Sequence, residues 1–170
     1  MSHHFCGGQS CRELLNLYKN QGLSVGKRMN IEHNVVEISE IFNSCHNWED
    51  KYRQIIKFGK DLAPMADEFK IDNFKVKGCQ SQVWLHPTIE QGKVIFSADS
   101  DSMLVKGIIS LLIKVYSGQP PAAIIAFKPT FLSDLGISEH LSMNRSNGLA
   151  SMIKQIQMYA FTMKAVSDLK

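Results

Sequence analysis

Apolar positions along the chain change their spacing twice, from helical to strand-like and back to helical. In the segments 31–42 and 48–62 they recur every three or four residues, which predicts two amphipathic helices. Asn47 stands directly before the second segment and Asp50 follows three residues later, a pattern typical of a helix N-cap. Pro64 helps to end this helix, because proline lacks the N–H that a helix interior needs.

The middle of the chain predicts strands. Hydrophobic and lysine residues alternate around 74–76, and the runs 83–85 and 94–96 are rich in residues that favour strands. The dipeptide Gln91-Gly92 is a plausible hairpin turn between the last two runs. We therefore expect a small three-stranded antiparallel sheet, with the loop around Cys79 joining its first two strands.

Helical spacing returns after the strands. Ser100 or Asp101 is expected to cap a helix that continues to Tyr116 and is closed by Gly118. Apolar residues cover most of its circumference, which is typical of a central, buried helix. Shorter helices are expected at 119–127 and 130–135, and a last one from Ser146 towards the C-terminus. The fold class is thus α+β, with the small sheet packed against helices.

Length and charge limit the domain organisation and the partners. A chain of 170 residues is most simply one folded domain, which we place at 31–170, after an appendage at 1–30 that carries several glycines. The appendage accounts for the net charge of +3, and the rest holds 15 basic and 15 acidic residues. The charge of the domain therefore does not support a surface that binds nucleic acid. Without an expected membrane span or secretory pattern, a cytoplasmic location is the default.

The four cysteines, Cys6, Cys11, Cys45 and Cys79, match no zinc-binding spacing, and no metal site is expected in the domain. In a reducing compartment they should remain thiols. Cys6 and Cys11 could form a disulfide or a partial metal site with the nearby histidines, an option that the sequence leaves open.

Cys79 is the strongest candidate for chemistry. It follows Gly78, which frees the backbone to turn, and it precedes a strand-like run instead of lying within one. Gln80, Ser81 and Gln82 offer neutral hydrogen bonds near the sulfur. A thiol presented in this way is suited to accept a covalently bound group and pass it on.

The chain resembles the SufE family in four blocks that occur in the family's order. They are Gly78-Cys79-Gln80-Ser81-Gln82-Val83-Trp84; Trp48-Glu49-Asp50-Lys51-Tyr52; Asp99-Ser100-Asp101 with Val105-Lys106-Gly107; and Leu141-Ser142 with Asn144-Arg145-Ser146-Asn147-Gly148-Leu149. Asn147 stands where the family often has Gln. The resemblance covers about residue 31 to the C-terminus and implies the fold that SufE proteins share with IscU-type scaffolds.

The resemblance implies a sulfur acceptor that activates a pyridoxal-phosphate-dependent cysteine desulfurase. Cys79 would carry persulfide sulfur from this partner, SufS-like or CsdA-like, to a downstream iron–sulfur scaffold. The chain would be a sulfur-transfer partner rather than an enzyme, with no cofactor of its own. Gln80-Ser81-Gln82 favours the SufE branch over CsdE without deciding the pathway. The sequence does not fix the oligomeric state, and a homodimer is one of the options.

Three charged residues are candidates for supporting the cysteine loop or contacting the partner. Asp99 and Asp101 could simply cap a helix, but the resemblance places this turn near the cysteine loop. Arg145 lies in a polar turn, where its forked guanidinium could anchor the loop or the partner surface, or could pair with a surface carboxylate.

Two other functions compete with sulfur transfer. An iron–sulfur scaffold needs several thiolates, and the domain offers only Cys79 and Cys45. A cysteine hydrolase needs a base, for which His86 and His140 are candidates without a recognisable motif. Both functions are therefore less well supported than sulfur transfer.

Overall fold

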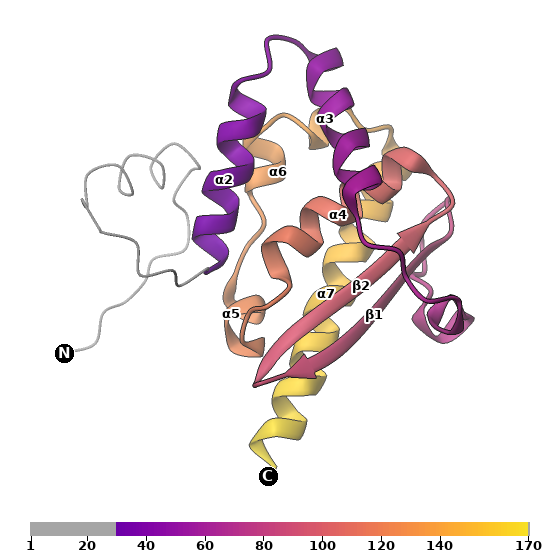
Figure 1. The fold of residues 1–170 in the computed structure, drawn as a ribbon, viewed down its shortest axis with the longest axis vertical. Coiled ribbons are helices and arrows are strands. Elements are labelled where there is room, and N and C mark those ends of the chain that lie inside the picture. Colours follow the sequence, from indigo (N-terminus) through magenta and orange to yellow (C-terminus); the bar gives the residue numbers. More distant parts are fainter. Residues whose placement is uncertain (1–29, 170) are drawn as a thin grey trace, which may run out of the picture.

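A computed structural model describes residues 30–169. The prediction of an appendage at 1–30 concerns residues outside this range, apart from Asn30. The elements follow in the order α2 (Ile31–Asn43), α3 (Trp48–Asp61), the 3-10 turns η1 (Asp67–Phe69) and η2 (Asp72–Phe74), β1 (Val83–Glu90), β2 (Lys93–Ser100), α4 (Met103–Tyr116), α5 (Pro121–Ala126), α6 (Phe131–Asp134), η3 (Ser138–His140) and α7 (Met143–Asp168). Figure 1 shows the hairpin and α7 running through the lower half of the molecule, with α2 and α3 above.

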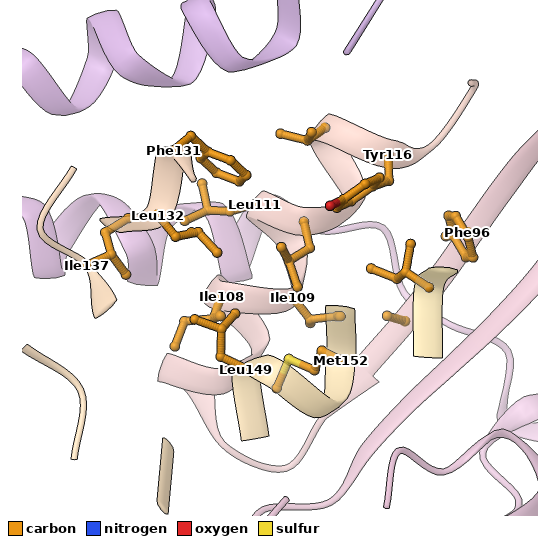
Figure 2. Packing of buried hydrophobic residues seen from close by; sticks show 14 of the residues in the cluster. Phe96, Ile108, Ile109, Leu111, Tyr116, Phe131, Leu132, Ile137, Leu149 and Met152 are labelled. Carbon is orange, nitrogen blue, oxygen red and sulfur yellow. The ribbon is translucent and has the colours of Figure 1, made fainter. Parts of the chain in front are cut away.

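Helix α4 is the centre of the fold, as its apolar circumference predicts. It packs against α2, α3, α7 and strand β2. Ile108, Ile109 and Leu111 on this helix are almost completely buried, and Figure 2 shows them between side chains of α6 and α7. Burial of such side chains supplies the main driving force for folding.

The sheet has two strands within the described residues, so the prediction of three strands is wrong in this respect. Strands β1 and β2 pair antiparallel from Val83–Ser100 to Glu90–Lys93. Their turn is the predicted Gln91-Gly92, and both residues have positive φ angles, 49° and 75°.

The segment expected as the first strand forms the turn η2 and then a single bridge between Lys75 and Trp84. Its backbone is curled by tertiary packing, because the Phe74 ring lies edge-on against His86 and against Phe69. Local alternation does not reveal such contacts, which join residues up to 12 positions apart in the sequence.

Helix ends agree with the sequence where a local cap decides them. The Asn47 side chain accepts a hydrogen bond from the Asp50 N–H at 2.9 Å, as predicted. Helix α4 instead starts at Met103, with Ser102 as its cap, because Ser100 and Asp101 bind the cysteine loop. Helix α7 starts at Met143, three residues before the predicted position.

Helices α3 and α4 approach closely through two glycines. A Cβ atom at Gly107 would overlap the backbone oxygen of Ile55, and one at Gly59 would lie 2.8 Å from the Gly107 nitrogen. Neither position accommodates a side chain without a shift of the backbone. This contact fixes α3 against the start of α4, which also positions the site described next.

In the part of the chain that the structure describes, no helix has both the length and the apolar character required to cross a membrane.

Candidate functional site

The Cys79 loop is closed at its base by backbone contacts. The Val76 N–H donates to the Val83 carbonyl at 2.8 Å, and Lys75 forms its bridge with Trp84 on the same side. The residues between Val76 and Val83 therefore form a short loop with its two ends held together. The predicted position of Cys79 at a loop before a strand agrees with this geometry, although the loop follows a 3-10 turn and one bridge.

Gln82 is the anchor on the strand side of the loop. Its N–H donates to Asp101 Oδ1 at 3.0 Å, while its carbonyl accepts from the Asp101 N–H at 3.2 Å and from Ser100 Oγ at 2.8 Å. Lys75 Nζ donates to its side-chain oxygen at 3.2 Å. The structure thus brings Gln82 and Asp101 together, and Asp101 acts on the backbone of the loop.

The Cys79 thiol is half-buried against the first part of α7. It donates to the Gly148 carbonyl oxygen over 3.5 Å. A Cβ atom on Gly148 would lie 3.3 Å from the sulfur, so the absence of a side chain there leaves room for the thiol. Burial raises the pKa of the Cys79 thiol above its ordinary value, because the thiolate would lose hydration. In this position the sulfur is a protonated, poorly reactive thiol at neutral pH.

Gly78 allows the loop to turn towards α7. Its φ angle is +87°, a conformation that residues with a Cβ rarely adopt. An added Cβ would also lie 2.8 Å from Ser151 Oγ on α7. Both the backbone and the close approach therefore favour glycine next to Cys79.

A pocket of about 90 Å³ opens beside the sulfur. The residues that line it are Cys79, Gln80, Ser81, Val105, Ile108, Asn144, Arg145, Gly148 and Met152. Ile108 and Met152 belong to the core of α4 and α7, where Figure 2 shows them close together. The pocket thus combines apolar core side chains with polar groups from the loop and from the start of α7.

Arg145 lies in the first turn of α7 rather than in a turn before the helix. It lines the pocket together with Cys79 and is exposed to solvent. Among the ion pairs of the described residues, none involves Arg145. Arg145 thus lines the same pocket as Cys79 and has no ion-pair partner among residues 30–169.

Asp99 is held by two lysines and does not line the pocket. Lys70 Nζ lies 2.9 Å and Lys106 Nζ 2.8 Å from its carboxylate oxygens, and the Ser100 N–H donates to it at 2.9 Å. Burial alone would raise the pKa of Asp99, but the hydrogen bonds from Lys106 and Lys70 outweigh this and hold the pKa below its ordinary value. This network ties the segment before the cysteine loop to the start of α4.

The two histidines considered as bases lie in aromatic contacts elsewhere. His86 stacks on Phe69 with ring centroids 3.9 Å apart, and the His140 ring lies 4.1 Å from that of Trp48. Burial lowers the pKa of His86 from its ordinary value. Within residues 30–169, no group of three His, Cys, Asp or Glu side chains is arranged to hold a metal ion.

Several site residues were not singled out from the sequence. They are Val105, Ile108, Asn144, Gly148, Ser151 and Met152. Val105, Asn144 and Gly148 fall within the motif blocks that carry the resemblance, so the blocks were the available signal. The contact between Cys79 and Gly148 joins residues 69 positions apart and has no local signature.

Comparisons with known proteins agree on one family. The model of the SufE family, described as an Fe-S metabolism associated domain, matches residues 36–160. SufE-like protein 1, chloroplastic/mitochondrial, from Arabidopsis thaliana is 40% identical over 133 residues, which cover 78% of this chain and 36% of that protein. The chain therefore spans about a third of that relative's length.

A solved structure gives the same fold. The solution structure of a hypothetical protein from Thermus thermophilus has a TM-score of 0.66 at 21% identity and covers 78% of this chain and 96% of that one. At this identity the similarity concerns the fold alone. With the family model covering most of the described residues, the chain belongs to the SufE family of proteins associated with iron–sulfur metabolism.

Proposed function

We propose that this protein accepts sulfur on Cys79 from a pyridoxal-phosphate-dependent cysteine desulfurase and delivers it towards iron–sulfur cluster assembly. The observation that carries the proposal is the position of this thiol. It lies in a short loop whose two ends are held together, beside a pocket that its own sulfur lines. Membership of the SufE family supports the same role.

The reaction is an exchange at sulfur. The Cys79 thiolate attacks the outer sulfur of a persulfide on the desulfurase, a new S–S bond forms, and the donor cysteine leaves as a thiolate. Oxidation states are conserved overall, because the transferred sulfur only changes its carrier. Cys79 then holds the persulfide and can pass it to the next thiol in the same way. Removing sulfur from the desulfurase cysteine would also raise that enzyme's turnover.

The tucked position of Cys79 must change during this reaction. A half-buried sulfur under the Gly148 carbonyl is shielded from a large partner, and its pKa is raised by burial. Entry into the active site of the desulfurase requires residues 77–81 to swing outwards on the anchor formed by Gln82 and Asp101. Leaving the half-buried position lowers the cost of forming the thiolate, since the desolvation is relieved.

The proposal is tested by mass spectrometry after incubation with an active cysteine desulfurase and cysteine. We expect the peptide that contains Cys79 to gain one or more sulfur atoms, and Cys79→Ser to lose this gain while the protein stays folded. The matched control is Cys45→Ser, because Cys45 is the other free, partly buried thiol of the described residues. Full sulfur acceptance by Cys79→Ser would refute the proposal.

Two points of the function remain predictions. A cytoplasmic location is expected from the sequence, whereas the name of the Arabidopsis relative places that protein in chloroplasts and mitochondria. The choice between a SufS-like and a CsdA-like desulfurase is also open. Parallel assays with one desulfurase of each kind would show which gives the faster sulfur transfer to Cys79.

A further inference from the structure

A second cavity opens between α2 and α3, which Figure 1 shows joined by a short loop at the top of the molecule. It has a volume of about 330 Å³, within the range of pockets that hold small molecules. The residues that line it are Ile41, Gln54, Lys57, Phe58 and Asp61. None of them lines the pocket beside Cys79, so this cavity is distinct from the candidate site.

The apolar part of the lining is held in place by the core. Ile41 and Phe58 are partly buried and pack against the buried cluster. The Phe58 ring stacks on the fully buried Phe42, with ring centroids 6.3 Å apart and ring planes 13° apart. The Phe58 carbonyl also accepts a hydrogen bond from Ser110 Oγ of α4 at 2.8 Å. This wall of the cavity is therefore pre-formed, and it can cover a hydrophobic side chain of a ligand.

The polar part of the lining carries one positive and one negative charge. Lys57 and Asp61 are exposed and lie four residues apart on α3. This spacing places them on one face of the helix, about 6 Å apart along its axis. Neither takes part in an ion pair among residues 30–169. Gln54 adds an amide one turn before Lys57, and this amide can donate or accept a hydrogen bond.

The positions of the two charges on the helix favour partners from outside it. A cation four residues before an anion is the less favourable orientation of a helical ion pair, which disfavours a bond between Lys57 and Asp61. Asp61 is also the last residue of α3, where the end of the helix dipole is negative. The negative potential around Asp61 therefore favours a bound cation, whereas the Lys57 ammonium, one turn earlier, favours an anion.

One class of small molecule matches all parts of this lining. A free α-amino acid carries an ammonium and a carboxylate on one carbon atom, together with a side chain that can be apolar. The ammonium would meet Asp61, the carboxylate would meet Lys57, and the side chain would pack on Ile41 and Phe58. A simple anion would be repelled by Asp61 and a simple cation by Lys57. A residue inside a peptide has neither free charge.

We propose that the cavity between α2 and α3 is a binding site for a free α-amino acid with an apolar side chain. The inference concerns residues outside the sulfur-transfer site and does not depend on that reaction. Because Lys57 and Asp61 are both exposed, each charged contact with the ligand is weak in water. The dissociation constant is therefore on the order of 1 mM.

Amide NMR spectra of the isotope-labelled full chain, recorded during titration with L-leucine at pH 6.5, test the proposal. We expect saturable shifts at residue 41 and at residues 54–61, with half-saturation at about 1 mM. Two analogues test the charges, because N-acetyl-L-leucine lacks the ammonium and L-leucinamide lacks the carboxylate. Each analogue should bind the wild type several-fold more weakly than L-leucine does.

Two variants assign the charges to residues. Lys57→Gln should abolish the preference for L-leucine over L-leucinamide, and Asp61→Asn should abolish the preference for L-leucine over N-acetyl-L-leucine. Lys60→Gln is the matched control, because Lys60 is exposed on the same helix but does not line the cavity, and it should bind like the wild type. The proposal would be overturned by the absence of saturable shifts up to about 20 mM, by shifts confined to other residues, or by equal binding of all three compounds. Preferences that persist in the two variants would overturn it as well.

Discussion

At the scale of single residues, Gly148 lies directly against the half-buried Cys79 thiol. Its missing side chain leaves room for the Cys79 sulfur, which a Cβ would approach to 3.3 Å. We expect Gly148→Ala to push the thiol away from the carbonyl and into solvent. Alkylation of Cys79 by iodoacetamide at fixed pH should then become several times faster.

Stability should change little in this variant, because alanine favours a helix by about 1 kcal/mol over glycine and offsets the crowding. Asn147→Ala is the control, since it improves the same turn of α7 without touching the sulfur. An unchanged alkylation rate in Gly148→Ala would show that Gly148 does not hold the thiol in place.

The pKa of Cys79 gives a second prediction at this scale. Burial raises it above the ordinary value for a cysteine, so the folded protein holds the thiol proton more tightly than the unfolded chain does. The Cys79 thiol therefore contributes to folding stability at pH values below the ordinary pKa. This contribution is lost as the pH rises through the pKa that the thiol has in the folded state. Alkylation of the Cys79 peptide, followed across the alkaline range by mass spectrometry, should reach its half-maximal rate at a higher pH in folded than in urea-unfolded protein. Equal midpoints would contradict the tucked position.

At the scale of elements, Asp99 joins the η1 turn to α4 through Lys70 and Lys106. These lysines hold the pKa of Asp99 below its ordinary value. Asp99 therefore contributes to folding stability at pH values above the pKa that it has in the unfolded chain. The contribution is lost as the pH falls through the pKa of the folded state. We expect Asp99→Asn to lower stability by about 1 kcal/mol at pH 7, and we expect this difference to shrink as the pH falls through the pKa that Asp99 has in the folded state.

Urea unfolding between pH 2 and 7 measures this difference. Asp72→Asn, which changes an exposed carboxylate in η2, serves as a comparison. A difference between wild type and Asp99→Asn that does not vary with pH would mean that the network does not depend on charge.

The same elements show what the sequence can and cannot predict. The cap at Asn47 and the turn at Gln91-Gly92 are local, and both were predicted correctly, because the residues that decide them are neighbours. Phe74 was placed in a strand, but its ring packs on His86 and the backbone curls into η2. The loss of the third strand thus follows from a contact that no local pattern carries.

In the candidate site, too, the sequence predicts local features but not contacts between distant residues. Cys79 and Gly78 stand out in the sequence because a glycine and a cysteine before a strand are a local signal. Gly148 and Ser151 meet this loop only after the chain has returned through α7, about 70 residues later. The motif blocks assign both segments to one family, but only the folded structure shows that they lie within contact distance of one another.

At the scale of the whole molecule, the buried core and the candidate site both lie within the described residues. The buried cluster runs from Ile31 to Ala160, and α2 is capped by Asn30, whose side chain accepts from the His33 N–H at 2.9 Å. The family model matches residues 36–160. A chain that begins at Met29 keeps this cap and this core.

We therefore expect removal of residues 1–28 to leave the melting temperature within about 2 °C of the full chain, a shift of less than about 0.5 kcal/mol. Sulfur acceptance on Cys79 should also be nearly unchanged, because the loop, its anchors and its pocket lie between Lys75 and Met152. Thermal unfolding and the mass-spectrometric assay measure the two effects separately. A large loss of acceptance with an unchanged melting temperature would assign a role in sulfur transfer to the first 28 residues, whereas a loss of both would assign them a role in folding.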